Sequence, residues 1–403
     1  MLVVIPFLAC CIIWAIASPI STDISCTIST QYKIGDLKEP EPLLLKQVDN
    51  NATIWYPDDD DGTLRIFAGD SIYLACPGKN NYFQKRNYNE VEAVCVKDKV
   101  FKVKGVRQHI SSLVCKFYPE HHAQYMDTPS CLDEQSSIEI GFNVRDTFIR
   151  TIELCRDKKT YTTYYTKFTM TKMIKSNQRN YPRPFKFLVG KFYPWINMDY
   201  LYKFETQLDT LARILNSIEL AKKRLKKSLQ FLSRGHLVAK TDFVYGSQQR
   251  STFWYLNTAP QWQTFNAGNW NFLEISIRHF AASRRLDLDV YTGVHGQMTM
   301  EDIHNEQQPV YLAEDIISVP KFYWKVIYDP LSKCGTAFVG LNDPFITLVT
   351  DDVYLCTDIS ERIEWLNWEP SNITLGISYA CSVDDLRKAL PVVPLLDVID
   401  ILM

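Results

Sequence analysis

The sequence carries almost no net charge. Its 44 Lys and Arg residues stand against 46 Asp and Glu residues, and the formal charge is −2. Overall charge therefore does not attract polyanions, and any affinity for phosphate groups requires a local basic patch. Internal repeats and low-complexity tracts are absent as well. A content of 46% apolar and 13% aromatic residues indicates a folded chain and not a disordered one.

A second long apolar run is also missing. Residues 1–13 are almost entirely apolar, and Ala15-Ile16-Ala17 before Ser18 has the small-x-small pattern of a leader cleavage site. We expect residues 1–17 to be a secretory signal peptide, which makes the protein extracellular. Because this segment lacks Lys and Arg, a non-cleaved anchor is the alternative. The apolar tail 391–403 contains two Asp residues, so we expect a packed end and no membrane contact.

The cysteines lack the closely spaced pairs of a zinc site. In an exported chain disulfides are their expected use, and we predict at least three. The eleven cysteines include Cys10 and Cys11 in the leader, and the remaining nine are an odd number. One of these is therefore unpaired or bridges to another chain. Asn51 and Asn372 begin sequons, which predict glycosylation of an exported chain.

Residues 18–140 are predicted to form a small β-rich module stapled by disulfides. Strand-like runs at 64–67 and 71–76 follow turn signals, and four of the cysteines lie between residues 24 and about 125. The acidic run from Asp58 to Asp61 lacks the ligand spacing of a calcium loop, so we interpret it as a solvated turn. The polar segment 121–137 places a domain boundary near residue 140.

Residues 141–403 combine strand and helix patterns, which indicates an α+β domain with a mixed sheet flanked by helices. The runs 160–166 and 168–170 are rich in β-branched and aromatic residues, as strands are. Between Phe204 and Leu229 apolar residues recur at a helical period, and we predict a helix that carries a basic run. This basic run is either a solvated helix face or a patch that attracts phosphate. It consists of Lys222, Lys223, Arg224, Lys226 and Lys227.

One stretch, residues 233–243, holds residue types that phosphodiester cleavage requires. His236 is a potential general base, and Arg234 is a cation for the phosphate. Asn257, Asn266 and Glu274 follow, and their oxygens are ligands that a hard divalent cation prefers. An imidazole, hard oxygen ligands and a cation together make up a site for metal-assisted hydrolysis.

A helix is predicted from Gly268 onward. Trp270, Leu273 and Ile277 recur at the spacing of one helix face. Glu274 and Arg278 share a face because they are four residues apart, and we expect the same helix to present Asn266 near its beginning.

At these residues the chain resembles the DNA/RNA non-specific endonuclease family, with its ββα-metal site. Within the family it resembles secreted insect double-stranded RNA nucleases in particular, and a salivary nuclease-like protein of a blood-feeding fly is one identity that the resemblance allows. The resemblance covers roughly residues 140 to 390. It continues through three further blocks, which are Leu286-Asp-Leu-Asp-Val-Tyr-Thr-Gly293, Val319-Pro-Lys-Phe-Tyr-Trp-Lys-Val-Ile-Tyr-Asp329 and Gly335-Thr-Ala-Phe-Val339. It implies a ββα-metal endonuclease domain at 141–403 that acts on the phosphates of DNA and RNA, single- or double-stranded.

The resemblance also implies roles for three residues around a metal ion. His236 matches the general base that takes a proton from the attacking water. Asn266 matches the direct ligand of Mg²⁺, or of another divalent cation such as Mn²⁺. Glu274 matches the carboxylate that orients metal-bound water. One amide ligand suffices because magnesium keeps several waters.

The remaining matched positions concern charge and support. Arg234 and Arg278 match the cations that meet the phosphate, and Asn257 matches a supporting amide, although capping a turn before Pro260 is the alternative for it. Ser233 departs from the family pattern, since many members have Asp there and other secreted insect members do not.

Two main functions remain open from the sequence. The first is a secreted, metal-dependent endonuclease without sequence specificity, in line with the absence of a base-reading motif. The alternative is a high-affinity nonspecific nucleic-acid-binding protein of saliva in which the same scaffold has weak or no nuclease activity. A third, weaker hypothesis makes residues 18–140 an adhesion unit.

Overall fold

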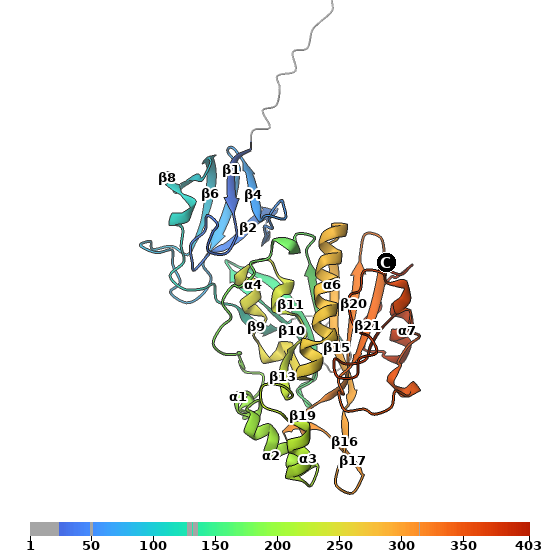
Figure 1. Cartoon of the computed structure of the whole chain (residues 1–403). Coiled ribbons are helices and arrows are strands. Elements are labelled where there is room, and N and C mark those ends of the chain that lie inside the picture. The colour runs from blue at the N-terminus through green and yellow to red at the C-terminus, as the bar shows by residue number, and fades with distance from the viewer. Residues whose placement is uncertain (1–23, 49–50, 127–130, 132–135, 314) are drawn as a thin grey trace, which may run out of the picture.

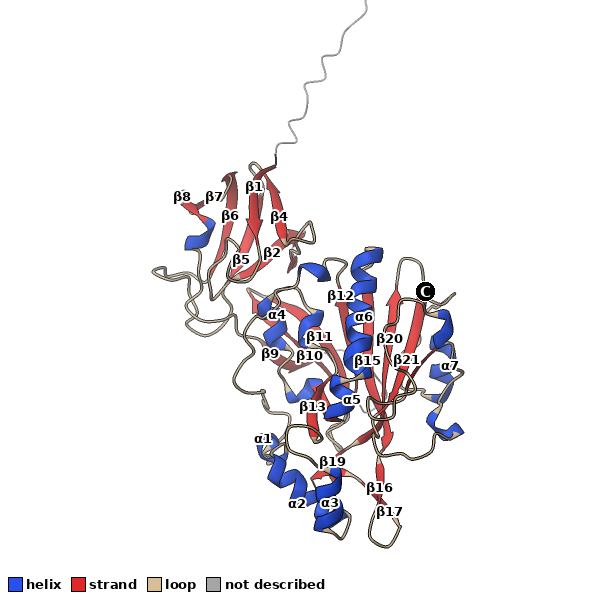
Figure 2. Cartoon of the chain, viewed as in Figure 1, coloured by secondary structure: helices blue, strands red, loops and turns tan. Residues whose placement is uncertain are grey.

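The computed structural model describes residues 24–48, 51–126, 131, 136–313 and 315–403. The predicted leader and the two cysteines in it lie outside these ranges. The N-terminal strands form one end of the molecule and a larger part with sheet and helices forms the rest (Figures 1 and 2). No helix within the described ranges is long and apolar enough to cross a membrane.

The N-terminal part is built from two antiparallel sheets, and burial alternates along several of their strands because one face of each of these strands points into the core. In β6, for example, buried residues alternate with more exposed ones. β1 (Ile24–Ser29) pairs with β4 (Thr63–Phe67). The second sheet has the order β3 (Asn51–Ile54), β2 (Leu43–Val48), β5 (Ser71–Ala75), β6 (Glu90–Lys97), β7 (Val100–Val103) and β8 (Val106–His109).

The larger part is organised around an eight-stranded sheet, and the predicted α+β class is confirmed. All pairings in this sheet are antiparallel, so the expectation of a mixed sheet was wrong in that detail. Its order is β22 (Ser378–Cys381), β21 (Cys334–Leu341), β20 (Pro320–Asp329), β15 (Leu288–Gln297), β12 (Thr163–Met170), β11 (Thr147–Arg156), β10 (Ser136–Val144) and β9 (His122–Tyr125). β9 and the first residues of β10 precede residue 140 in the sequence but belong to this sheet. The domain boundary near residue 140 stays a prediction.

Three two-stranded sheets and seven helices complete the described chain. The hairpins are β13 (Leu232–His236) with β14 (Thr258–Trp262), β16 (Thr299–Glu301) with β17 (Gln307–Pro309), and β18 (Tyr311–Ala313) with β19 (Ile316–Ser318). The helices are α1 (Met198–Leu201), α2 (Phe204–Ile214), α3 (Ile218–Arg224), α4 (Gly246–Ser251), α5 (Gln263–Ala267), α6 (Asn269–Arg284) and α7 (Val383–Ala389). Short 3₁₀ turns lie at Ile110–Ser112, Ile174–Ser176, Lys240–Asp242, Tyr255–Asn257, Asp351–Val353 and Ser360–Arg362.

The helix predicted between Phe204 and Leu229 is two helices. α2 ends at Ile214, and Asn216 adopts a φ of 52°, a left-handed conformation that interrupts a helix and that Asn tolerates. Ser217 then caps α3 by accepting a hydrogen bond from Leu220 N. The periodicity alone did not reveal this break. As a consequence, Lys226 and Lys227 follow α3 instead of lying within it.

Four disulfides link the described cysteines, which confirms the prediction of at least three. They join Cys26 to Cys95, Cys76 to Cys115, Cys131 to Cys155 and Cys356 to Cys381. Two of them staple the N-terminal sheets. Among the cysteines that the structure describes, Cys334 is free, which accounts for the odd number.

Buried polar groups connect the N-terminal part to the larger part. Glu41 lies next to Glu39, and its Oε2 accepts a hydrogen bond from Gln178 Nε2 (2.8 Å). Glu39 in turn accepts one from Tyr181 Oη (2.7 Å). Burial, and to a smaller extent the charge of Glu39, raise the pKa of Glu41 to about 8. The acidic turn is not simply solvated, because Asp60 forms ion pairs with Lys175 and Arg285.

The buried carboxyl group of Glu41 predicts that the stability of the fold depends on pH. The folded state keeps a proton on Glu41 up to about pH 8, whereas a free Glu loses it near 4.5. Between these values the folded state binds more protons, so the free energy of unfolding falls as pH rises. Glu41→Gln mimics the protonated form and should reduce that fall. Urea unfolding at about pH 5 and about pH 8 measures it, with the exposed Glu361→Gln as control. An equal fall in the wild type and Glu41→Gln would contradict the assignment.

Candidate functional site: a ββα unit

Most of the residues singled out from the sequence lie on β13, α5 and α6, and Asn257 ends the 3₁₀ turn just before β14. The paired strands β13 and β14, with α5 and α6 after them, form a ββα unit, and α4 lies in the connection between the two strands. β13 and β14 are antiparallel, with His236 opposite Thr258 and Ser233 opposite Gln261. Because side chains alternate along a strand, Arg234 and His236 lie on one face of β13 and Ser233 on the other.

His236 ends β13 in a half-buried aromatic environment. Its ring lies 5.3 Å from the ring of Phe187 and 5.0 Å from that of Phe253. Burial lowers the pKa of His236 to about 4. Its Nε2 is buried and has no hydrogen-bond partner within the described part of the chain. At neutral pH the imidazole is therefore uncharged and has an unpaired nitrogen, which a general base requires.

Arg234 is held in place by groups that the sequence did not point to. Its Nε donates to Tyr255 Oη (2.8 Å), and Tyr255 Oη donates to Asp199 Oδ1 (2.6 Å). The same Asp199 oxygen lies 3.3 Å from Arg234 Nη2. The guanidinium also lies 4.8 Å from the centre of the Tyr202 ring. The cation is thus oriented by an acid and two tyrosines, and its side chain keeps 29% exposure.

Asn266 does not lie on the long helix, which corrects the expectation that one helix presents it together with Glu274. It belongs to α5, and Gly268 separates α5 from α6. Asn266 Nδ2 donates to Ser233 Oγ (3.1 Å), which itself donates to the carbonyl of Gln261 (2.9 Å). Its Oδ1 receives no hydrogen bond from the residues described. The amide is therefore turned so that its oxygen is free.

The residues fit a divalent cation with few protein ligands. A free amide oxygen is a ligand that Mg²⁺ or Mn²⁺ accepts, with water in its other positions. No group of three or more His, Cys, Asp and Glu side chains suited to a metal exists among the described residues. A metal held here would thus depend on Asn266.

Glu274 and Arg278 belong to a buried cluster of two carboxylates and two cations. Arg278 Nη1 lies 2.6 Å from Asp242 Oδ1, in a pair whose side chains are 13% and 2% exposed. Burial raises the pKa of Glu274 to about 7, with a further contribution from Asp242, while Lys325 and Arg278 oppose the shift. Lys325 is itself buried and lies 5.3 Å from the centre of the Trp270 ring.

Asn257 is fully buried and bonded to backbone groups. Its Oδ1 accepts from Val238 N (2.9 Å), and its Nδ2 donates to the carbonyls of Val238 and Thr252 (3.0 and 2.9 Å). All these contacts stabilise the segments that follow β13 and precede β14. Asn257 thus supports the site through the backbone.

The basic run lies beside α5. Its four lysines are exposed, and the chain after α3 closes into a turn in which Lys226 N donates to the carbonyl of Gln230 (2.8 Å). Gln230 Oε1 then accepts from Thr264 Oγ1 (3.1 Å), two residues before Asn266. The turn therefore places these cations next to the helix that carries the candidate metal ligand.

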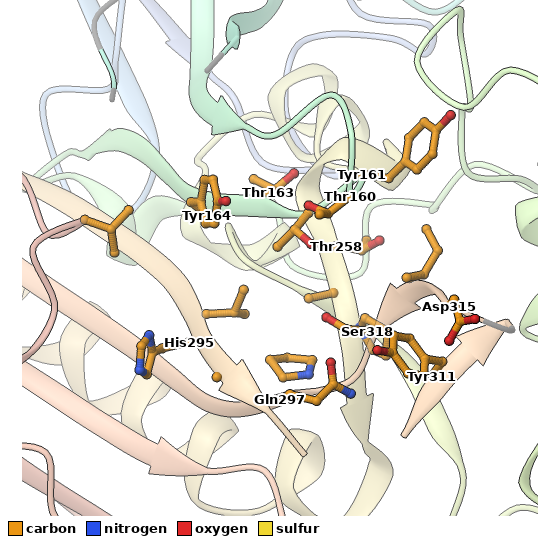
Figure 3. A pocket seen from close by; sticks show the side chains of 18 of the residues that line it. Thr160, Tyr161, Thr163, Tyr164, Thr258, His295, Gln297, Tyr311, Asp315 and Ser318 are labelled. Carbon is orange, nitrogen blue, oxygen red and sulfur yellow. The ribbon is translucent and has the colours of Figure 1, made fainter. Parts of the chain in front are cut away.

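A cavity of about 630 Å³ contains none of the predicted site residues (Figure 3). His295, Gln297 and Tyr311 are among the residues that line it. It borders the site because Tyr202, under Arg234, and Thr258, opposite His236, also line it. The chemistry nonetheless points to the ββα unit, where the oriented cation, the neutral imidazole and the free amide oxygen lie.

Several residues at the site were missed from the sequence. Asp242, the partner of Arg278, lies within the 233–243 stretch, and Lys325, whose charge acts on Glu274, lies within the 319–329 block. Both residues are therefore part of the sequence blocks that indicated the site. Gln261 is buried, and neither polar atom of its amide has a partner in the described chain. Asp199 and Tyr255 gave no sequence signal, because only the fold brings them to Arg234.

Comparisons with known proteins identify the family of the chain. Residues 134–386, more than half of the chain, match the model of the DNA/RNA non-specific endonuclease family. A salivary endonuclease of Lutzomyia longipalpis is 26% identical over 90% of this chain and 83% of its own length. Salivary protein Tsal2A of Glossina morsitans morsitans is 24% identical over 92% and 94%. A salivary endonuclease of Culex quinquefasciatus is 32% identical over 40% and 44%.

One solved structure, of the EndoG/EndoGI complex, is 18% identical, with a TM-score of 0.33 over 54% of this chain and 80% of that chain. That TM-score is too low to support an argument. The length of the family match decides the assignment: the chain belongs to the DNA/RNA non-specific endonuclease family.

Proposed function

We propose that the protein is a secreted endonuclease that hydrolyses phosphodiester bonds of DNA, RNA or both with one divalent cation and without sequence specificity. The observation that carries the proposal is the state of His236. Its imidazole is neutral at physiological pH, its Nε2 has no hydrogen-bond partner among the described residues, and it shares a face of β13 with the oriented cation of Arg234.

In this proposal His236 Nε2 takes a proton from the water that attacks phosphorus. Asn266 Oδ1 would hold the cation, and the hydrogen bond from Asn266 Nδ2 to Ser233 Oγ fixes the orientation of the amide. When bound, Mg²⁺ or Mn²⁺ supplies a positive charge that stabilises the charge developing on the phosphate oxygens. Glu274 would be the carboxylate that orients water at the site.

The two arginines act differently. Arg234 contacts the phosphate, because its guanidinium is partly exposed and already oriented by Asp199 and Tyr255. Arg278 is paired with Asp242 and nearly buried, so it stabilises the position of Glu274 one turn away and contacts the phosphate little.

Secretion is part of the proposal. It is supported by the leader pattern at residues 1–17, by four disulfides and by the salivary relatives. Of the two sequons, Asn51 is exposed and suits a glycan. Asn372 is half-buried and its Nδ2 donates to Glu369 (2.8 Å), a bond that a glycan would have to replace. Both remain predicted sites.

Replacing the general base should separate cleavage from binding. His236→Ala removes the proton acceptor and leaves Arg234, so cleavage should fall by at least roughly a hundredfold while binding persists. Digestion of plasmid DNA and double-stranded RNA with Mg²⁺, and with EDTA, measures the first. Gel shift measures the second, and the exposed His304→Ala is the matched control.

Other outcomes are equally informative. If His236→Ala cuts as fast as the wild type, His236 is not the base. If the wild type binds nucleic acid but never cuts with any divalent cation, the protein is the nonspecific binding protein that the sequence left open.

Ser233 should control metal affinity more than the rate at saturation. Ser233→Ala removes the acceptor for Asn266 Nδ2, so half-maximal activity should need roughly 10- to 100-fold more Mg²⁺. The rate at saturating Mg²⁺ should change little. Ser233→Thr and Ser233→Asp keep an acceptor and should retain the wild-type Mg²⁺ requirement. An unchanged Mg²⁺ titration for Ser233→Ala would remove this role.

The basic run should contribute to affinity through charge. Changing its five cations to Gln should weaken binding of all sequences alike and flatten the dependence on salt. The control changes five cations of the N-terminal part to Gln, namely Lys85, Lys97, Lys102, Lys104 and Arg107. Filter binding at several salt concentrations compares the two. An unchanged slope would make the basic run a solvated surface.

A further inference from the structure

The segment 182–197, which we call the aromatic loop, exposes two large rings. Phe185 and Trp195 are 109% and 102% exposed, more than any other large hydrophobic residue of the described chain. Trp195 also has a φ of 69°, a left-handed conformation that costs energy for a bulky side chain. Neither ring contributes to the core. Exposed aromatic rings of this kind indicate a binding surface.

The aromatic loop is fixed to the candidate site in its middle. Leu188 N donates to the carbonyl of Phe253 (2.8 Å), and Tyr255 N donates to that of Leu188 (3.0 Å). These bonds hold Phe187 beside both catalytic candidates, because its ring lies 5.3 Å from the His236 ring and 5.4 Å from the Arg234 guanidinium. Phe185 is two residues away, roughly 7 Å of extended chain.

The other end of the aromatic loop is fixed as well. Tyr193 Oη donates to the carbonyl of Tyr255 (3.1 Å). Four residues after Trp195, Asp199 pairs with Arg234. Both exposed rings therefore lie within a few residues of groups that contact Arg234 or His236.

The charge of the aromatic loop is entirely positive. It contains Arg183, Lys186 and Lys191 and no Asp or Glu. All three cations are exposed. Lys191 Nζ and Lys158 Nζ lie 5.0 Å and 4.9 Å from the centre of the Tyr125 ring, which extends the combination of cations and rings onto β9. Such a surface suits a polyanion that also presents flat rings.

We propose that Phe185 and Trp195 stack on unpaired bases of the nucleic acid whose phosphate lies at Arg234. This inference rests on the proposed function and adds a contact to the bases. The cations of the aromatic loop attract the backbone, and the two rings bind bases regardless of sequence, since every base has a flat face. Bases within a duplex are covered by their neighbours, so the contact favours unpaired segments.

The test uses full-length protein in EDTA and a fluorescein-labelled single-stranded oligonucleotide. Phe185→Ala and Trp195→Ala should each weaken binding by roughly 5- to 150-fold, the loss expected for one stacked base. Phe67→Ala, a 51% exposed ring on the N-terminal sheet, is the matched control and should bind as the wild type does. Thermal melting checks that all variants are folded.

Three further probes identify the contact. An oligonucleotide with abasic sites should bind the variants and the wild type equally, and a blunt duplex should show a smaller loss. The salt dependence should stay unchanged because no charge is removed.

Equal binding of the single strand by the wild type and both variants would overturn the proposal and leave the endonuclease function intact. A wild type that neither binds nor cuts any nucleic acid would overturn both. The proposal would also be overturned if the variants lost binding only to vesicles of phosphatidylserine and phosphatidylcholine and bound the single strand as the wild type does. That result would assign the rings to a lipid surface.

Discussion

The buried ion pair between Arg278 and Asp242 is the interaction on which the site depends. It ties α6 to the segment that leaves β13, so the distance between the strand carrying His236 and the helix carrying Glu274 is fixed by one contact of 2.6 Å. Removing either partner would leave a buried charge, at a cost of about 3–5 kcal/mol. Because Glu274 and Lys325 share this environment, their ionisation is tied to it.

Two other residues of the candidate site, Arg234 and Asn266, are each oriented by neighbouring polar groups. Asp199 and Tyr255 orient Arg234, and Ser233 orients Asn266. His236 differs, because it lies against the rings of Phe187 and Phe253 and its Nε2 has no hydrogen-bond partner in the described part of the chain. Its burial keeps the imidazole neutral. The candidate site thus combines oriented polar groups with a neutral imidazole.

The N-terminal part is joined to the rest through buried polar contacts and ion pairs. Glu39 and Glu41 contact Gln178 and Tyr181, a few residues before the aromatic loop begins. The start of that loop is therefore anchored by residues from the opposite end of the chain. The N-terminal part therefore stabilises a segment of the larger part that lies close to the candidate site.

The sequence by itself determined the α+β class, the disulfide-rich character, the helix that begins after Gly268 and the stretch around His236. These depend on local periodicity, on composition and on residues a few positions apart, which a chain displays directly. It did not determine the break at Asn216 or the separation of Asn266 from α6, because a left-handed residue or a Gly interrupts a helix without disturbing the apolar pattern. Only the tertiary structure decided that Asp199, Asp242 and Lys325 join the site, since burial and pairing across distant strands create their roles.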